Sequence, residues 1–363
     1  MAGARRELTD IIIKIILKDG KVSEVEFDED EETLDLARKK IVEIDLSQLE
    51  GSTNLVNLDL GSNRIESIDL SPLVTCPNLS TLSLFKNALP DVDISPLAKC
   101  NNLTELNLGS TGISEISLAP LKNSKLTRLR LFTNQLSEID LKPISNMKTL
   151  EIVELENNNL SEIDLNPLTG CTELSQINLM YNELSSIDLS PLSECTKMKF
   201  LYLHHNVIRD IDLTALSKWA DLRILRLGGN EIESVDLSSL KVATGLRRIG
   251  LAMNRIEQLV LEPLAMCTEL RALDIAGNRL QKVDLGPLRN CTSLEELYLY
   301  SNHPEENSIE ELEIDALFQC ADLEDLGVHS DTKLLASATL KKRKKIPYAI
   351  EELIEEDSIT WIK

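Results

Sequence analysis

Leucines and other apolar residues recur along this chain at one fixed spacing, which is clearest between Leu174 and Cys195. There the sequence reads L-x-x-L-x-L-x-x-N-x-L-x-x-I-D-L-S-P-L-x-x-C, and the pattern begins again at Met198. The leading apolar residue occurs at Leu55, Leu79, Leu103, Leu126, Leu150, Leu174, Met198, Leu222, Leu246, Leu270, Leu294 and Leu323. The steps are 24 residues long, apart from one of 23 and one of 29. A fixed period of this length predicts tandem units that stack into a solenoid.

Each repeat divides into two predicted elements joined by an asparagine. The Leu-x-Leu alternation predicts a short strand with its leucines inward, and strands of successive coils should pair in parallel. Ser-Pro in the second half predicts a helical or 3₁₀ turn, with serine as N-cap and proline at the first helical position. Between them, a buried amide can satisfy backbone groups of neighbouring coils. The asparagines are Asn63, Asn87, Asn134, Asn158, Asn182, Asn206, Asn230, Asn254, Asn278 and Asn302. Thr111 takes this place before the short repeat, so we expect an irregular coil there.

This leucine and asparagine pattern resembles that of leucine-rich-repeat proteins over roughly residues 33 to 331. The resemblance implies an α/β right-handed solenoid, curved like a horseshoe. A parallel β-sheet would line its concave face and short helical or 3₁₀ turns its convex face. We predict an N-terminal cap over residues 1–54, made of a β-hairpin and a degenerate repeat. A solenoid of about 12 repeats follows over residues 55–331, and a helical C-terminal cap over residues 332–363.

The charge balance narrows the range of partners. The chain has 38 basic and 60 acidic residues, and its net charge is −22. An acidic surface repels phosphate backbones and anionic lipid, which argues against nucleic acid or membrane as the main partner. The apolar run from Ile11 to Leu17 contains Lys14 and has no small-residue cleavage site, so we interpret it as neither a signal peptide nor a membrane span. We expect a soluble monomer.

The cysteines predict the compartment. Seven cysteines occupy one repeat position, at Cys76, Cys100, Cys171, Cys195, Cys267, Cys291 and Cys320. This column predicts buried, reduced thiols that pack as small hydrophobic groups. Free thiols are typical of a reducing compartment, so we predict a cytoplasmic, intracellular protein. The basic run Lys341–Lys345 has the composition of a nuclear-import signal, although pairing with Glu351, Glu352, Glu355 and Glu356 is the favoured interpretation.

No catalytic constellation emerges, so we predict no enzyme activity, no cofactor and no metal. The four histidines lack metal-ligand spacing, and no Gly-rich phosphate loop occurs. A ladder of aspartates precedes the turns, at Asp45, Asp69, Asp93, Asp140, Asp164, Asp188, Asp212, Asp236 and Asp284. Each repeat offers one carboxylate, whereas calcium takes six or more oxygens. Backbone capping or solvated charge is therefore favoured, and cation binding stays open.

The outward positions of the predicted strands supply the candidate site. Aromatic and charged residues gather there, and tyrosine and arginine dominate binding hot spots. The predicted partner-binding residues are Arg130, Phe132, Glu154, Glu156, Met180, Tyr181, Phe200, Tyr202, His204, His205, Arg226 and Arg248. A secondary candidate consists of Tyr298, Tyr300 and His303. The following Gly228, Gly250, Ala252 and Ala276 predict a shallow trough. The alternative is that these rings merely cover the sheet or pack on the C-terminal segment.

We therefore predict a non-enzymatic scaffold that holds a partner protein on its concave face. The repeat spacing most resembles that of the short-repeat intracellular class of leucine-rich-repeat proteins, which includes phosphatase regulatory subunits. The 24-residue unit departs from the repeat of that class. The alternative function is regulation of an enzyme, as a GTPase-activating protein or a phosphatase regulatory subunit. The partner itself does not follow from these residues.

Overall fold

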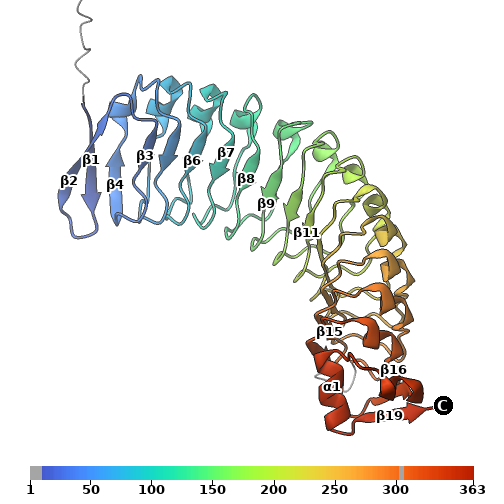
Figure 1. Ribbon diagram of the computed structural model, residues 1–363. Coiled ribbons are helices and arrows are strands. Elements are labelled where there is room, and N and C mark those ends of the chain that lie inside the picture. The colour runs from blue at the N-terminus through green and yellow to red at the C-terminus, as the bar shows by residue number, and fades with distance from the viewer. Residues whose placement is uncertain (1–9, 302–305) are drawn as a thin grey trace, which may run out of the picture. The chain divides into compact units, whose positions relative to one another are not determined.

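The computed structural model describes residues 10–301 and 306–363, and the chain divides into two compact units, Met1–Leu160 and Ser161–Lys363. In both units each coil contributes a three-residue strand to a parallel sheet and then a 3₁₀ turn on the opposite side (Figure 1). The two units are described separately.

Unit 1 begins with an antiparallel hairpin, β1 (Asp10–Leu17) and β2 (Val22–Asp28), and β4 (Ile41–Asp45) pairs with the other edge of β1. Its parallel sheet contains, in spatial order, β3 (Thr33–Asp35), β5 (Asn57–Asp59), β6 (Thr81–Ser83), β7 (Glu105–Asn107), β8 (Arg128–Arg130) and β9 (Ile152–Glu154). The 3₁₀ turns are η1 (Ser47–Leu49), η2 (Ser71–Thr75), η3 (Ser95–Lys99), η4 (Ala119–Leu121) and η5 (Lys142–Ile144). The degenerate repeat thus forms a coil of its own, with β3 as its strand.

Unit 2 continues the same architecture. Its parallel sheet contains β10 (Gln176–Asn178), β11 (Phe200–Tyr202), β12 (Ile224–Arg226), β13 (Arg248–Gly250), β14 (Ala272–Asp274), β15 (Glu296–Tyr298) and β17 (Asp325–Gly327). The 3₁₀ turns are η6 (Asn166–Leu168), η7 (Ser190–Leu192), η8 (Thr214–Lys218), η9 (Ser238–Val242), η10 (Glu262–Met266), η11 (Gly286–Asn290) and η12 (Asp315–Gln319). Every strand predicted from the twelve leading residues is present, and the leucine-rich-repeat solenoid fold is confirmed.

The C-terminal segment differs from the helical cap that the sequence predicted. It contains the α-helix α1 (Tyr348–Glu355) and the 3₁₀ turn η13 (Ala338–Lys342). It also contains β18 (Lys333–Ser337) and β19 (Ile359–Ile362), which join β16 (Glu311–Glu313) in a second parallel sheet. The predicted helix is present as α1, whereas β18 forms a strand because Leu334 and Ala336, both buried, follow the two-residue period of a strand.

The asparagines form a hydrogen-bonded column inside the turns. Asn230 is typical: its Nδ2 donates to the carbonyls of Leu203 (3.0 Å) and Leu227 (2.9 Å), and its Oδ1 accepts from the N–H of Ile208 (3.1 Å). One side chain thereby satisfies three buried backbone groups, two of them in the preceding coil. The column therefore locks each coil to the previous one.

Thr111 changes the hydrogen bonds of its turn without breaking the column, so the predicted irregularity is present but local. Its Oγ1 donates to the carbonyl of Leu108 at 2.7 Å, as an asparagine amide would. Asn134 of the next coil accepts from the N–H groups of both Thr111 (3.0 Å) and Gly112 (2.8 Å). The strands β7 and β8 keep a regular parallel register. Asn134 thus bonds one residue earlier than the other column asparagines do, and the backbone carbonyl of Thr111 accepts from the N–H of Leu89 at 2.8 Å in place of an amide oxygen.

At the C-terminal end of the column the structure corrects one assignment. Asn302 lies outside the described residues. The contacts of the column are made by Asn307, whose Nδ2 donates to Ile275 and Leu299 (both 3.0 Å) and whose Oδ1 accepts from the N–H of Leu280 (2.9 Å). The extra residues of this coil thus precede its column asparagine.

All seven cysteines are buried and free, as predicted. The Cys291 thiol, for example, donates to the carbonyl of Leu264 in the preceding coil at 3.5 Å. Trp219 occupies the same repeat position and donates from Nε1 to Leu192 at 3.1 Å. Burial raises the pKa of the Cys195 and Cys267 thiols to about 12. These thiols therefore stay protonated and unreactive, since the thiolate is the nucleophile.

The aspartate ladder caps the 3₁₀ turns. The Oδ1 of Asp188 accepts from the N–H of Ser190 at 2.9 Å, and Asp69 and Asp236 accept equivalent bonds from Ser71 and Ser238 at 2.8 Å. The prediction of serine as N-cap is wrong, since a leucine holds that position without a side-chain bond. The aspartate takes over because its carboxylate reaches the N–H two residues ahead.

Candidate functional site

The outward residues of the parallel strands, together with the turn residues that follow them, are named the sheet face. The turn residue immediately before the column asparagines from Asn63 to Asn278, and before Thr111, has a left-handed backbone. Its φ lies between 54° and 65° at Ser62, Lys86, Ser110, Thr133, Asn157, Tyr181, His205, Gly229 and Met253. Side chains at this position leave the turn beside the ends of the strands. The coil geometry therefore places Tyr181 and His205 next to the strand residues of the sheet face.

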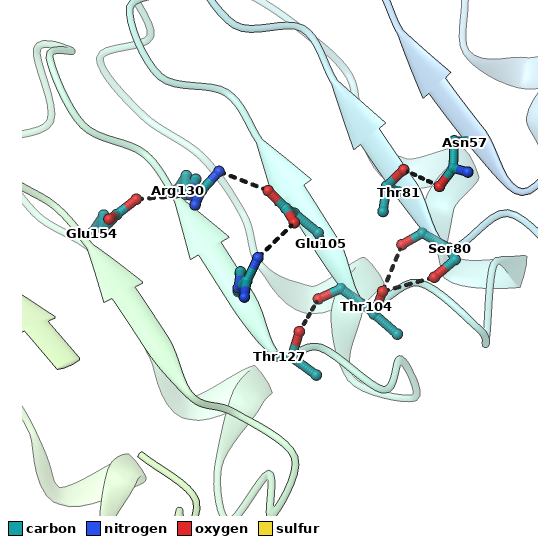
Figure 2. Close-up of polar contacts among 9 residues, drawn as sticks. Asn57, Ser80, Thr81, Thr104, Glu105, Thr127, Arg130 and Glu154 are labelled. Carbon is teal, nitrogen blue, oxygen red and sulfur yellow. Dashed lines mark hydrogen bonds and ion pairs between the residues drawn. The ribbon is translucent and has the colours of Figure 1, made fainter. Parts of the chain in front are cut away.

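On unit 1 the sheet face carries polar side chains that satisfy one another (Figure 2). Arg130 lies between two acids: its NH1 is 2.8 Å from Oε1 of Glu105, and its Nε is 2.9 Å from Oε2 of Glu154. Arg128 adds a longer contact of 3.6 Å to Glu105. Towards β5, Thr81 donates to the side chain of Asn57 at 2.6 Å. These contacts fix Arg130 and Glu154 in place, so neither presents an uncompensated charge.

Two phenylalanines form the apolar part of this face of unit 1. The rings of Phe85 and Phe132 lie 5.6 Å apart and come from coils that are two steps apart in the stack. A Cβ on Gly109, in the coil between them, would lie 2.6 Å from the Phe132 ring. Gly109 therefore makes the room in which Phe132 lies flat across the neighbouring strand.

Glu156 is the unusual acid of unit 1. Burial, with a smaller contribution from Glu154, raises the pKa of its carboxyl to about 7, while Arg130 opposes the shift. Its Oε2 is buried and has no hydrogen-bond partner among the described residues. Since an unsatisfied buried oxygen is costly, a neutral carboxyl is favoured there near neutral pH.

The largest aromatic group of unit 2, named the ring cluster, consists of Tyr181, Phe200, Tyr202, His204 and His205. Tyr181 and His205 stack with centroids 4.3 Å apart, and His204 meets Tyr181 edge-on at 5.9 Å. Tyr202 lies 6.2 Å from His204 and 6.4 Å from Phe200. The structure therefore brings together five of the residues predicted for the site. Tyr181 is 50% exposed, so the cluster is open to solvent at this end.

Burial sets the charge state of the ring cluster. It lowers the pKa of His204 to about 4, and His205 and Arg226 lower it further by like-charge repulsion. Burial also raises the pKa of Tyr202, against the effect of Arg226. His204 is therefore a neutral imidazole at neutral pH. Its Nδ1 is a buried atom without a hydrogen-bond partner in the described chain.

The predicted trough beside the ring cluster is partly filled. The Arg226 side chain lies across Gly250, because a Cβ on that glycine would be 3.0 Å from its Cδ. Arg248, which was predicted beside the cluster, instead pairs with Glu296 at 3.3 Å. Met180 is half-buried at the end of β10. The small residues of the trough thus make room for the chain's own arginine.

The secondary candidate lies on the last coils of unit 2. Tyr298 and Tyr300 meet edge-on at 6.0 Å, and a Cβ on Gly327 would come within 2.8 Å of Tyr298 and 2.9 Å of Tyr300. His303 lies outside the described residues. The sequence-based selection omitted Glu105 and the glycines under the rings, although a glycine one coil from an outward aromatic is a usable signal.

The parallel three-residue strands, 3₁₀ turns and asparagine column define a solenoid repeat protein. Sequence models described as "Leucine rich repeat" match residues 124–184 and 172–232, and a "BspA type Leucine rich repeat region (6 copies)" model matches residues 32–142. The chain belongs to the leucine-rich-repeat proteins. A search of curated proteins found no match by sequence.

Solved structures with the same leucine-rich-repeat fold are similar to this chain. An internalin from Listeria monocytogenes has a TM-score of 0.66 and 27% identity, over 86% of this chain and 84% of the internalin. The functional domain of InlJ from the same species, which includes a cysteine ladder, has a TM-score of 0.66 and 23% identity, over 84% of this chain and 59% of its own. A leucine-rich-repeat protein from Leptospira interrogans has a TM-score of 0.65 and 20% identity, over 87% and 86%.

These comparisons correct the predicted location. The BspA-type match and the internalin similarity point to a bacterial surface or secreted protein, so the predictions of a cytoplasmic or nuclear protein are wrong. The inference from free thiols failed because the cysteines are shielded within the core, where burial keeps them protonated in any compartment. In the described part of the chain, no helix is long and apolar enough to span a membrane.

The class also bears on function at a coarse level. Proteins with leucine-rich repeats commonly mediate protein–protein interactions, and the fold is known as a non-enzymatic interaction scaffold.

Proposed function

We propose that this protein binds a partner protein on the sheet face, with the ring cluster of unit 2 at the centre of the contact. It does so as a non-enzymatic scaffold at a bacterial surface or after secretion. The observation that carries the proposal is the ring cluster itself: five adjacent rings with one half-exposed tyrosine and one buried, unpartnered imidazole nitrogen among the described residues.

The composition of the cluster suits a protein partner. Tyrosine supplies a large contact area at little cost in side-chain entropy, and hot spots are enriched in tyrosine and arginine. The rings cannot serve the core, since the inward residues of β10 and β11, Ile177 and Leu201, are already buried in it. Arg226 adds a positive charge beside the rings.

The predicted residues of unit 1 contribute in a different way. Arg130, Glu154 and Glu105 satisfy one another, so a partner would have to break those pairs to use them. Phe132 offers apolar area beside Phe85. We propose this patch as a separate, weaker contact surface. Tyr298 and Tyr300 remain the alternative centre on unit 2.

The test begins with affinity capture of partners by the immobilised chain from bacterial culture supernatants and surface extracts. A captured protein is then titrated against the wild type and Tyr202→Ala. Loss of a hot-spot tyrosine should weaken binding by about 2 kcal/mol, or roughly 30-fold in Kd. Tyr348→Ala is the matched control, since Tyr348 is 59% exposed on α1. Equal affinities for both variants and the wild type would place the interface elsewhere. A captured GTPase or phosphatase whose turnover changes on binding would favour the regulatory alternative.

A further inference from the structure

The C-terminal segment carries a concentrated positive charge on an otherwise acidic protein. Lys341, Lys342, Arg343, Lys344 and Lys345 are consecutive, and this run is named the basic patch. Because the whole chain is −22 and the run contributes +5, the remaining residues carry −27. The four lysines are exposed and Arg343 is half-buried. Such a concentration of charge calls for a partner of opposite sign.

The acidic residues of α1 do not neutralise the basic patch, so the pairing favoured from the sequence is wrong. Among the described residues, none of the five cations lies within 4.0 Å of a carboxylate oxygen. Instead, the Nζ of Lys341 lies 4.8 Å from the ring centroid of Trp361, and Arg343 donates to Oε1 of Gln319 at 2.9 Å. These contacts hold Lys341 against β19 and Arg343 against η12. Within the described residues, the positive charges of the basic patch stay without an acidic partner.

An open groove of about 400 Å³ adjoins the basic patch. It is lined by Arg289 and Asn290 of η11, by Asp315, Ala316 and Gln319 of η12, and by Leu340 of η13. The one carboxylate in this lining, Asp315, already accepts hydrogen bonds from the N–H and hydroxyl of Ser337. The Oδ1 of Asn290 and the Nε2 of Gln319 can pair with a peptide backbone, while the other atoms of these amides bond to Ala265 and Arg343. The groove therefore combines a basic rim with neutral hydrogen-bonding groups.

We infer that the basic patch and this groove form a docking site for a short acidic peptide segment of a partner protein. The carboxylates lie against the patch, and the peptide backbone runs along the groove. The charge distribution favours a short segment over a long polyanion or a membrane plane, because either would extend over a surface with a net charge of −27. The groove volume matches a few residues. This site is independent of the ring cluster.

The test uses a fluorescein-labelled peptide of ten glutamates, followed by anisotropy with the full chain. The wild type should bind at about 0.1 M salt and lose binding near 1 M, where the Debye length falls from about 10 Å to about 3 Å. Binding should also change the fluorescence of Trp361, which lies under Lys341, and this signal should vanish in Trp361→Phe. Trp219 is fully buried and should not respond.

Two triple variants separate the patch from the total charge. Lys342→Glu/Lys344→Glu/Lys345→Glu should weaken peptide binding by roughly tenfold or more. The control Lys199→Glu/Lys241→Glu/Lys282→Glu has the same net charge and reverses exposed lysines elsewhere on unit 2, so it should bind almost as the wild type does. Equal losses in both triples, or no binding by the wild type at about 0.1 M salt, would overturn the inference.

Two further probes address the rival anions. Ten-nucleotide oligothymidylate and phosphatidylglycerol vesicles are titrated under the same conditions, and both should bind more weakly than the peptide. Tighter binding of either by about tenfold would replace the acidic peptide as the ligand of this patch.

Discussion

The ring of Tyr181 stacks on the ring of His205, with centroids 4.3 Å apart and an angle of 11° between the planes. Both residues have a left-handed backbone, with φ of 54° and 56°. They occupy the same turn position in consecutive coils, and the next coil has Gly229 there. A left-handed conformation is unfavourable for residues with a Cβ. The stack is therefore held at a position where the fold would otherwise favour glycine.

The backbone strain at this turn position can be measured on an exposed residue without ring contacts. Met253 has φ of 56° and is 64% exposed. Met253→Gly should raise the free energy of unfolding by about 0.5–1 kcal/mol, since relief of left-handed strain exceeds the entropy that glycine adds to the unfolded chain. Met266→Gly is the control, because Met266 is similarly exposed and does not have a positive φ. It should lower stability by about 0.5–1 kcal/mol. Urea denaturation of both variants checks the opposite signs.

The absence of a side chain at Gly229, beside the His205 ring, gives a second prediction. A Cβ on Gly229 would lie 2.7 Å from Nδ1 of His205, and φ at Gly229 is 65°. Gly229→Ala should therefore cost about 2 kcal/mol or more, from backbone strain and displacement of the ring. Gly277→Ala has the strain alone, since a Cβ there would meet nothing closer than 3.4 Å, and it should cost about 1 kcal/mol. Equal costs in urea unfolding would show that the His205 ring moves freely.

The asparagine column gives a third prediction. Asn230→Ala leaves the carbonyls of Leu203 and Leu227 and the N–H of Ile208 without their partner. Since each buried orphan costs about 1–3 kcal/mol, the loss should be about 3 kcal/mol or more. Asn101→Ala, at an exposed position, should stay within about 0.5 kcal/mol. A similar loss for both variants in urea unfolding would mean that water replaces the column amide.

His204 should make stability depend on pH below neutrality. Its pKa is lowered in the folded protein from 6.5 to about 4, first by burial and then by His205 and Arg226. The unfolded chain thus binds more protons between these values, so the stabilising contribution is complete above about pH 6.5 and is lost as the pH falls towards 4. His204→Gln should reduce the drop in melting temperature between pH 6.5 and 4. An unchanged drop would contradict a buried neutral imidazole.

Glu156 should make the stability of the folded protein depend on pH in the opposite direction. Its pKa is raised in the folded protein from 4.5 to about 7, mainly by burial. The folded chain binds the extra proton in this window, so its stabilising contribution is complete below about pH 4.5 and is lost as the pH rises towards 7. Glu156→Gln, which keeps a neutral side chain, should be more stable than the wild type near pH 7 and not near pH 4.5. Thermal melts at both values check this, and Glu162→Gln, at an exposed position, is the control that removes the same charge. The same gain near pH 7 in both variants would trace the effect to net charge instead of burial.

The repeat pattern alone predicts the solenoid of this protein. A period of 24 residues specified the strands of β5 to β15, because each coil buries its leucines only against its neighbours. The cysteine column followed for the same reason, since one repeat position meets one environment. The outward positions of the strands also followed from the two-residue alternation, and they led to Tyr181, Tyr202 and His204 as neighbours.

Which of those outward residues find a partner depends on the folded chain. Arg130 lies between Glu105 and Glu154, and Arg248 pairs with Glu296, because long side chains reach across coils to partners that strand position does not specify. Asn307, and not the residue that the repeat spacing indicates, bonds through its side chain to Leu280 and Leu299 in the column. Likewise, Lys341 contacts Trp361 and Arg343 contacts Gln319, because the fold places η13 beside η12 and β19. The acids of α1 do not reach these cations. Contacts between residues distant in sequence set these outcomes, and no local pattern contains them.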